Sequence, residues 1–266
     1  MSARRTVSSY RILAFLALFP ACRAEAPEPV NAGPSLSEPA SADSGTPEPV
    51  AAEPPPPTHY FGREIARTMH WRGAEWLLRE TREKEENVAL LMEALDVRPG
   101  MTVCDLGCGN GFHTLRLAEA VGPAGRVFAV DIQEPMLRML GERVAEAGFT
   151  NVDPILGGVA DPKLPDGSCD LILLADVYHE ISHPEEMLAN IRRALKPDGR
   201  VVLVEFRAED PEVPIKRLHK MSKAQIVKEL QPSGLELVRE FDELPWQHVM
   251  FFGRAEATAP PPPPPR

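Results

Sequence analysis

The chain has 266 residues and a formal net charge of −10, with 29 Lys and Arg against 39 Asp and Glu. This length suits one domain with accessory segments, or at most two small domains. The acidic balance and the lack of a long basic run disfavour nucleic acid as the main partner. Proline is concentrated, because ten of the 29 lie in Pro27–Pro57 and six form Pro260–Pro265. The folded part is therefore expected at about residues 59–255.

Residues 1–24 have the pattern of an export signal. Three arginines precede the apolar run Ile12–Phe19, which is too short to span a bilayer and suits the apolar core of a signal peptide. Two cleavage sites compete: a loose lipobox ending at Cys22, which is slightly favoured, and Ala24-Glu25-Ala26 for an ordinary signal peptidase. Arg4-Arg5 also forms a partial twin-arginine signal. We expect a cell-envelope protein, either periplasmic or tethered through a lipidated Cys22; the alternative is an uncleaved tail on a cytoplasmic protein.

Residues 25–58 consist largely of Pro, Ala, Glu and Ser and cannot bury enough apolar area to offset their ordering entropy. They are predicted to be a disordered linker, and residues 256–266 a proline-rich tail. If Cys22 is lipidated, three cysteines remain, which is a poor basis for a disulfide framework. Cys104 and Cys108 flank the turn of a strand–loop–helix and should point in different directions, and no further His or Cys lies near them at a short zinc-binding spacing, so no metal is expected.

Residues 59–98 are expected to be helical. Val88, Leu91, Met92 and Leu95 have the spacing of one helix face. The charged run Arg82–Glu86 is expected to be a solvated helix face. Three large side chains of this segment are expected in the core rather than in a substrate site: Met69, Trp71 and Trp76. The segment would pack over the strand ends as a lid or extend the core.

From residue 99 onward, strand and helix patterns alternate. Strands are predicted at 101–105, 126–131, 151–156, 169–175, 200–206, 235–241 and 247–252. Helices are predicted at 112–120, at 135–147, from residue 184 to about 195 and from 222 to 230. This alternation predicts an α/β fold with a doubly wound, seven-stranded, mainly parallel sheet. The two last strands form a hairpin, which makes one strand antiparallel.

The turn after the first of these strands carries glycines at alternate positions, Gly107, Gly109 and Gly111. Dinucleotide sites use G-x-G-x-x-G, but Phe112 occupies the position of the third glycine. Asp105 precedes the loop, where a carboxylate would repel a pyrophosphate and attract an ammonium or sulfonium group. Asp131 ends the second strand, where an acid can accept both ribose hydroxyls of an NAD or an adenosyl ligand.

Residues 103–111, taken with Asp131, resemble the class I S-adenosylmethionine-dependent methyltransferases. The resemblance covers about residues 99–253 and includes Leu164–Asp170 and Leu195–Arg200, segments typical of the approach to the fourth and fifth strands. It implies a Rossmann-like methyltransferase domain at residues 99–255 with S-adenosyl-L-methionine as cofactor. The nearest subgroups are the ubiquinone/menaquinone-type and arsenite-type small-molecule methyltransferases, although thiolates for an arsenite mechanism are not evident.

The resemblance also implies roles for individual residues. The methionyl part of the cofactor would be held by Asp105, Gly107, Cys108, Gly109 and Gly111. Asp131 would bind the ribose, with Ile132 and Met136 against the adenine. Many relatives carry an acid five residues before the position of Pro165 to bind the adenine amine; that position is Ala160 here, and the adjacent Asp161 is the proposed substitute.

Polar residues follow strand 169–175 at the sheet edge where ligands bind. His179 is the candidate general base, with Asp176, Tyr178 and Glu180 as positioning residues; the alternative is that His179 merely caps a loop or helix. Further residues weighed for the pocket are Glu205 and Arg207, with His219 as a weaker candidate. His248 lies inside a strand and is expected to be structural.

The sequence thus predicts an enzyme that transfers a methyl group to an unidentified, small-molecule acceptor. One alternative is a methyltransferase-like domain that binds a ligand at the cell envelope without catalysis. The export signal favours that alternative, because S-adenosylmethionine is made in the cytoplasm. A second alternative, a nicotinamide oxidoreductase, is disfavoured by the glycine spacing.

Overall fold

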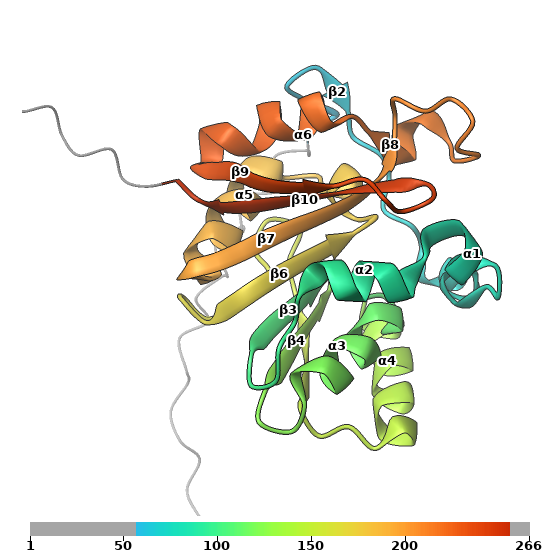
Figure 1. Ribbon diagram of the computed structural model, residues 1–266, viewed down its shortest axis with the longest axis vertical. Coiled ribbons are helices and arrows are strands. Elements are labelled where there is room, and N and C mark those ends of the chain that lie inside the picture. Colours follow the sequence, from blue (N-terminus) through green and yellow to red (C-terminus); the bar gives the residue numbers. More distant parts are fainter. Residues whose placement is uncertain (1–56, 256–266) are drawn as a thin grey trace, which may run out of the picture. The chain divides into compact units, whose positions relative to one another are not determined.

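The computed structural model describes residues 57–255, which are built on one large, mainly parallel sheet (Figure 1). The predicted signal, the linker up to residue 56 and the tail at 256–266 lie outside the described residues. The strands are β3 (Thr102–Leu106), β4 (Arg126–Asp131), β5 (Val152–Leu156), β6 (Cys169–Ala175), β7 (Leu195–Arg207), β8 (Lys220–Met221), β9 (Leu235–Phe241) and β10 (Gln247–Arg254). Their order is β5-β4-β3-β6-β7-β10-β9, with β8 beside β7.

The predicted sheet is confirmed, including its one antiparallel strand. β10 runs antiparallel to both β7 and β9, whereas the other pairs in this sheet are parallel. The eighth strand, β8, was not predicted, because two residues carry no readable pattern. Residues 196–199, which precede the predicted strand 200–206, bulge from β7, so this strand begins earlier than predicted. Leu195 pairs with Cys169 and Arg200 with Leu171, so these four residues stand opposite Asp170.

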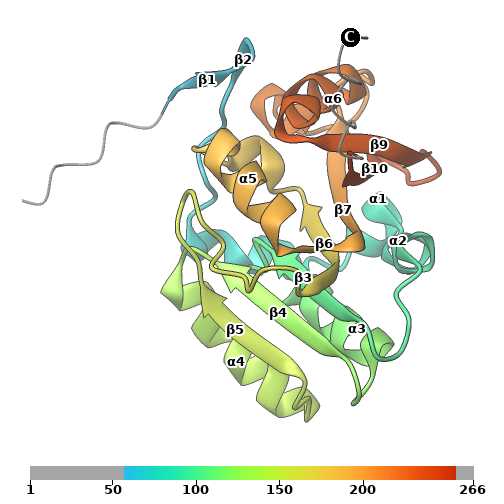
Figure 2. The ribbon, with the colours of Figure 1, turned by 90° about the vertical axis from the view of Figure 1, so that its left-hand side faces the viewer.

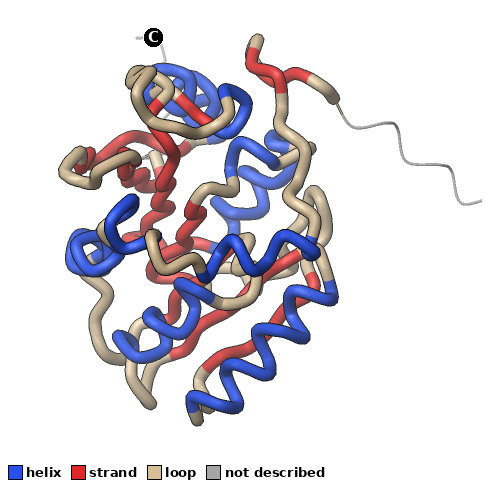
Figure 3. The backbone as a smooth tube through the Cα atoms, turned by 90° about the vertical axis from the view of Figure 1, so that its right-hand side faces the viewer, coloured by secondary structure: helices blue, strands red, loops and turns tan. Residues whose placement is uncertain are grey.

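Helices cover both faces of the sheet (Figure 2). The helices are α1 (Arg82–Glu86), α2 (Val88–Leu95), α3 (Phe112–Val121), α4 (Glu134–Ala147), α5 (Pro184–Ala194) and α6 (Lys223–Leu230). The apolar residues of α2 and α3 pack on one face of the sheet and those of α5 and α6 on the other. Seen from the opposite side, helices again stand in front of the strands (Figure 3). None of the described helices is long and apolar enough to cross a membrane.

The central strand β6 explains why the sheet is stable. Leu171 and Leu173 face the α2–α3 side, whereas Ile172 and Leu174 face the α5–α6 side, and all four are fully buried. Full burial of one such side chain contributes about 1.5–3 kcal/mol. The continuous apolar run therefore belongs to a strand that is covered on both faces.

The prediction of helices for residues 59–98 is wrong at its start. Residues His59–Tyr60 (β1) and Arg63–Glu64 (β2) form a small antiparallel hairpin. Its two turn residues, Phe61 and Gly62, both have positive φ, at 48° and 87°, as a tight hairpin turn requires. A 3-10 helix, η1 (Trp71–Leu78), then leads into α1 and α2.

The hairpin is fixed to the domain by Arg63. Its Nε and Nη2 atoms donate to the two carboxylate oxygens of Glu229 in α6, each at 2.8 Å. Its Nη1 atom donates to the backbone oxygen of His179. The Glu229 side chain is fully buried, so this bidentate pair is an internal contact rather than a surface one.

The prediction that Arg82–Glu86 forms a solvated face holds for Glu83 and Lys84, which are exposed, but is wrong for the two ends of the run. Arg82 is 4% exposed and Glu86 is 1% exposed. Arg82 donates to Glu86 Oε2 at 2.6 Å and to the backbone oxygen of Leu77, and its guanidinium lies 3.9 Å from the ring centroid of Phe112. A buried guanidinium needs such partners, and charge alone did not reveal them in the sequence.

Candidate functional site

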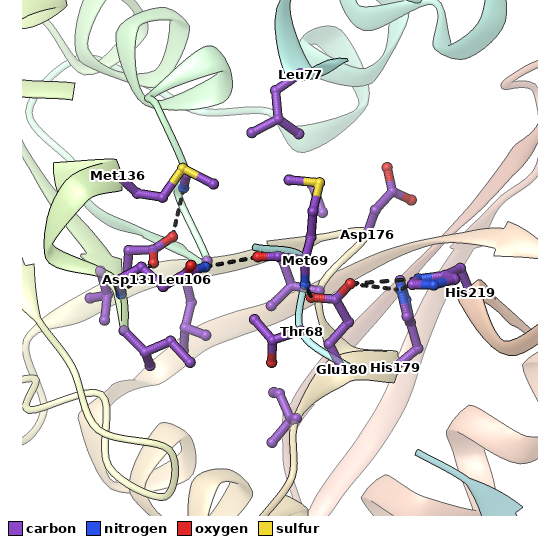
Figure 4. Close-up of a pocket in the computed structure, with 18 of the residues that line it drawn as sticks. Thr68, Met69, Leu77, Leu106, Asp131, Met136, Asp176, His179, Glu180 and His219 are labelled. Carbon is purple, nitrogen blue, oxygen red and sulfur yellow. Dashed lines mark hydrogen bonds and ion pairs between the residues drawn. The ribbon is translucent and has the colours of Figure 1, made fainter. Parts of the chain in front are cut away.

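A cavity of about 500 Å³ lies beyond the carboxyl ends of β3, β4, β6 and β7. Ligands bind at this place in open α/β sheets. Loops after these strands and the segment before α1 form the walls. The lining includes Thr68, Met69, Trp76, Leu77, Gly107, Gly109, Asp131, Ile132, Met136, Asp176, His179, Glu180, Lys216 and His219. Figure 4 shows ten of the lining residues labelled, with Asp131 and His179 at opposite ends.

The glycine loop forms part of the wall through Gly107 and Gly109. Gly107 has φ of 78°, and a Cβ atom on it would lie 2.5 Å from Cγ2 of Val177. A side chain is therefore excluded there both by conformation and by space. The amides of Gly107 and Cys108 donate to the backbone oxygen of Val130, which ties the loop to β4. Cys108 is buried, and Gly111 begins α3 as its N-cap; neither lines the cavity.

Asp131 is positioned by backbone amides at the end of β4. Its Oδ2 atom accepts from Gly109 N at 2.9 Å and its Oδ1 atom accepts from Gln133 N at 2.8 Å. Burial raises the pKa of this carboxyl. Each oxygen of a carboxylate can accept further hydrogen bonds, so the side chain is oriented and still able to accept from two neighbouring hydroxyls. This is the arrangement that a ribose diol requires.

The walls next to Asp131 are apolar. Ile132 and Met136 both line the cavity, as the resemblance implied, with Val159 and Pro162 among the other lining residues. Asp161 does not line the cavity, because its Oδ1 atom accepts from Lys163 N at 2.8 Å in a local turn. The structure therefore does not bring the proposed adenine-binding carboxylate to the site.

Asp105 lies beneath the glycine loop rather than at its mouth. The side chain is 2% exposed, is not part of the cavity lining, and accepts from Thr114 Oγ1 in α3 at 2.6 Å. Burial raises its pKa to about 6. The prediction that Asp105 contacts a cationic ligand at the mouth of the loop is therefore wrong. β3 ends one residue later, at Leu106, and it is Leu106 that reaches the cavity.

Residues 68–71, which we call the strap, cross the cavity from one rim to the other. Met69 N donates to Glu180 Oε2 at 3.0 Å, and Met69 O accepts from Gln133 Nε2 at 2.9 Å. Trp71 N donates to Gln133 Oε1 at 2.9 Å. Figure 4 shows Met69 between Asp131 and Glu180.

The large apolar side chains of the strap and of the 3-10 helix after it are not core residues, although the small Ala74 of that helix is buried. Met69 and Trp76 line the cavity, and Trp76 is 44% exposed, whereas Trp71 is partly buried. The prediction that these three side chains belong to the core is therefore wrong. The side chains of Met69 and Trp76 instead form part of the cavity wall, whereas Trp71 does not line the cavity.

The other end of the cavity holds His179, which is 2% exposed. Its Nδ1 atom lies 2.6 Å from Glu205 Oε2, and its Nε2 atom lies 3.0 Å from His219 Nδ1. Burial alone would lower the pKa of His179, but the Glu205 carboxylate raises it overall. For His219, burial and the neighbouring His179 lower the pKa. Glu205 fixes the ring so that Nε2 is the atom presented to the cavity.

Asp176 also reaches this end of the cavity. It has φ of 56°, a conformation that Asp tolerates better than most residues. Both of its oxygens accept from Gln247 Nε2, at 2.9 and 2.8 Å. Burial, followed by the nearby Glu86 and Glu205 charges, raises its pKa well above the ordinary value. Its carboxyl is thus held next to His179 and Glu205 in a partly buried acidic region.

Tyr178 is not brought to the site. Successive residues of a 3-10 turn point about 120° apart, so Tyr178 faces the core while His179 faces the cavity. Arg207 donates to the backbone oxygens of Asp242, Leu244 and Pro245 and holds the β9–β10 loop. His248 is buried within β10, 4.0 Å from Glu209, and does not line the cavity.

Sequence reasoning underweighted His219 and missed Gln133, Arg82 and Lys216, which also line the cavity. His219 and Lys216 lie in the loop after β7, and the carboxyl end of a parallel strand is the signal that could have found them. Gln133 follows the end of β4 by two residues and carries the same signal. Arg82 carries no such signal, because its place depends on how the segment before α2 folds over the sheet.

Residues 98–247 match the methyltransferase domain family. The chain belongs to this family. It is 39% identical over 113 residues to nocamycin O-methyltransferase of Saccharothrix syringae, covering 42% of this chain and 40% of that protein. It is 35% identical over 118 residues to the ubiquinone/menaquinone biosynthesis C-methyltransferase UbiE of Burkholderia cenocepacia, covering 44% of this chain and 48% of that protein. The chain thus aligns with less than half the length of these relatives.

The fold is also that of known methyltransferases. A SAM-dependent methyltransferase from Aquifex aeolicus superposes with a TM-score of 0.66 at 24% identity, over 70% of this chain and 98% of that one. Membership of the methyltransferase family identifies S-adenosylmethionine as the cofactor. The family and the fold give no support to the oxidoreductase alternative. The residues present fit this cofactor, since Gly107 and Gly109 expose backbone to the cavity and each carboxylate oxygen of Asp131 can still accept a hydrogen bond from a diol.

Proposed function

We propose that the protein transfers a methyl group from S-adenosylmethionine to a small-molecule acceptor whose nucleophilic atom carries a proton. One observation carries this proposal: a single cavity joins Asp131 at one end to the His179–Glu205 pair at the other. The first end suits the adenosyl group of the cofactor, and the second offers groups that accept a proton. The matched nocamycin O-methyltransferase and UbiE act on small molecules, which supports the same class of acceptor.

The reaction would be an in-line displacement. S-adenosylmethionine held at the Asp131 end would supply an activated methyl group to the nucleophile of the acceptor and would leave as a neutral thioether. The proton of the acceptor passes to the His179 end of the cavity, where Glu205 stabilises a positive imidazole. The protein's remaining task is to align the two molecules and exclude water, and the strap covers the cavity for that purpose.

The proposed binding of S-adenosylmethionine at Asp131 is tested with Asp131→Ala. Two hydrogen bonds to a carboxylate contribute about 1.5–3 kcal/mol each, so their loss weakens binding about 100-fold or more. Isothermal titration calorimetry with S-adenosylmethionine measures the change. Asp153→Ala is the matched control, because Asp153 is exposed on the neighbouring strand and does not line the cavity. Equal affinity in Asp131→Ala and the wild type would remove the ribose assignment.

Activity is tested by following S-adenosylhomocysteine formation with candidate phenols, enols and other hydroxylated small molecules. A domain that binds without catalysis would bind the cofactor with normal affinity but form no product with any of them. The His179 end of the cavity, where a positive imidazole is stabilised, supports the catalytic alternative. Turnover by the wild type that is lost in Glu205→Gln, with cofactor affinity retained, is the expected result.

We also propose that the protein is a membrane-tethered lipoprotein of the cell envelope, with Cys22 as the lipidated residue. The basic and apolar pattern of residues 1–24 supports this. Cys22→Ala should move the protein from the membrane fraction to a soluble fraction. A wild-type protein found in the soluble cytoplasm would refute the tether.

A further inference from the structure

Three side chains with metal-binding atoms converge at one end of the cavity. His179 and Glu180 lie in the 3-10 turn after β6, and His219 ends the 3-10 turn Arg217–His219 after β7. His179 Nε2 is 3.0 Å from His219 Nδ1 and 3.8 Å from Glu180 Oε1, and His219 Nδ1 is 3.5 Å from Glu180 Oε1. Figure 4 shows the three side chains pointing toward one another.

We propose that His179, Glu180 and His219 bind a divalent cation of the zinc class. Ligand atoms about 2.1 Å from such an ion are about 3.0 Å apart at right angles and about 3.4 Å apart in a tetrahedron. The three measured separations, 3.0, 3.5 and 3.8 Å, lie close to these values. The three atoms are therefore already spaced as neighbouring ligands of one ion, without a movement of the backbone.

The surroundings orient each ligand. Glu205 Oε2 lies 2.6 Å from His179 Nδ1, so the imidazole N–H points to the carboxylate and the lone pair on Nε2 points to the cluster. This carboxylate–histidine contact is typical of histidines that bind metals. Glu180 is oriented in the same way, because its Oε2 atom accepts from Met69 N in the strap and leaves Oε1 directed at the histidines.

The donor set selects the class of ion. Two imidazoles and one carboxylate suit zinc and its transition-metal neighbours, whereas magnesium and calcium prefer oxygen ligands. Three protein ligands leave a coordination position open, which is typical of catalytic rather than structural zinc. The cluster lines the cavity, so the open position would be reached from the space assigned to the acceptor.

The role of the ion rests on the proposed function. A hydroxyl oxygen bound to a divalent cation loses its proton more readily, which would make it a better nucleophile toward the methyl carbon. In that case His179 acts as a ligand rather than as the base itself. The alternative is a plain hydrogen bond between the two imidazoles at 3.0 Å, with no ion. No local pattern indicated the cluster, because its two histidines come from loops 40 residues apart in the chain.

The test uses the full chain, freed of metal with a chelator and then titrated with Zn²⁺ by calorimetry and with Co²⁺ by visible absorption. We expect one tight site per chain. His219→Ala and Glu180→Gln should each weaken Zn²⁺ binding about 100-fold. Glu180→Gln keeps an acceptor for Met69 N, and His219 is 34% exposed, so both variants should fold. His59→Ala is the control, because His59 is an exposed histidine away from the cavity.

S-adenosylmethionine binding is measured on the same samples. Zn²⁺ affinity that is unchanged in His219→Ala and Glu180→Gln, or absent from the wild type, overturns the metal site, and the cofactor site then stands alone. Tight Zn²⁺ binding that these two variants lose and His59→Ala keeps supports the metal site, even if the cofactor does not bind. That last result would refute the proposed function but not the site.

Discussion

Asp105→Asn tests the electrostatics beneath the glycine loop. Asp105 is 2% exposed and bonded to Thr114 Oγ1, and its pKa is raised from an ordinary 3.8 to about 6 by burial. The folded protein therefore holds this proton more tightly than the unfolded chain does. As pH rises from about 4 through about 6, the folded state must accept a buried charge, and stability is lost. Asparagine keeps the shape and the acceptor oxygen but never ionises.

The expected change in the free energy of unfolding follows from the pKa shift of Asp105. A change of about two pKa units corresponds to about 3 kcal/mol, and about 2 kcal/mol of this falls between about pH 4.5 and pH 8. We therefore expect the free energy of unfolding of Asp105→Asn, minus that of the wild type, to rise by about 2 kcal/mol over this range. The other buried acids are present in both proteins and cancel in the difference.

Urea denaturation of cofactor-free protein at about pH 4.5, 6 and 8 measures this difference. Calorimetry at neutral pH should show weaker S-adenosylmethionine binding by the variant, because a negative charge beneath the loop is lost. Asp153→Asn controls for the loss of an exposed aspartate. A difference in unfolding free energy that stays constant across this pH range would refute the reasoning.

Three further substitutions test the packing around the cavity. Gly111→Ala should lower the free energy of unfolding by about 2–4 kcal/mol, measured with urea, because φ is 86° and a Cβ atom would lie 2.3 Å from Cδ1 of Leu140. Glu86→Gln should cost about 3 kcal/mol in the same measurement, because it leaves the buried charge of Arg82 without its carboxylate; a change below 1 kcal/mol would contradict this. Gln133→Ala removes both hydrogen bonds to the strap, so hydrogen exchange at strap amides should become faster while amides of β6 stay protected.

The sheet could be predicted from the sequence because each main strand has a recognisable local residue pattern. β6 is a continuous apolar run and β4 ends at Asp131, and both bounds were predicted to the residue. Gly148 ends α4 and Ser222 caps α6, with Ser222 Oγ accepting from Gln225 N, in agreement with the predicted helices 135–147 and 222–230. Each of these signals lies within a few residues of the chain, so it predicts the local structure without knowledge of the tertiary contacts.

The parts that were missed depend on contacts between distant segments. Arg82 was assigned to solvent because its own segment shows the i,i+4 partner Glu86 but not the packing against the distant Phe112. Asp105 was placed at the mouth of the loop because spacing gives its position along the chain but not the face of β3 on which it lies. His219 approaches His179 only because two loops meet above the sheet. Such placements follow from the packing of whole elements.

The ion pair between Arg63 and Glu229 has a practical consequence for anyone preparing a fragment of this protein. The family match begins at residue 98, yet a polypeptide started there would lack the guanidinium that neutralises a fully buried carboxylate in α6. Removing one member of such a pair costs about 3–5 kcal/mol, a large part of the 5–15 kcal/mol that typically separates a folded domain from its unfolded chain. Recombinant versions should therefore begin near residue 57, upstream of the homologous region.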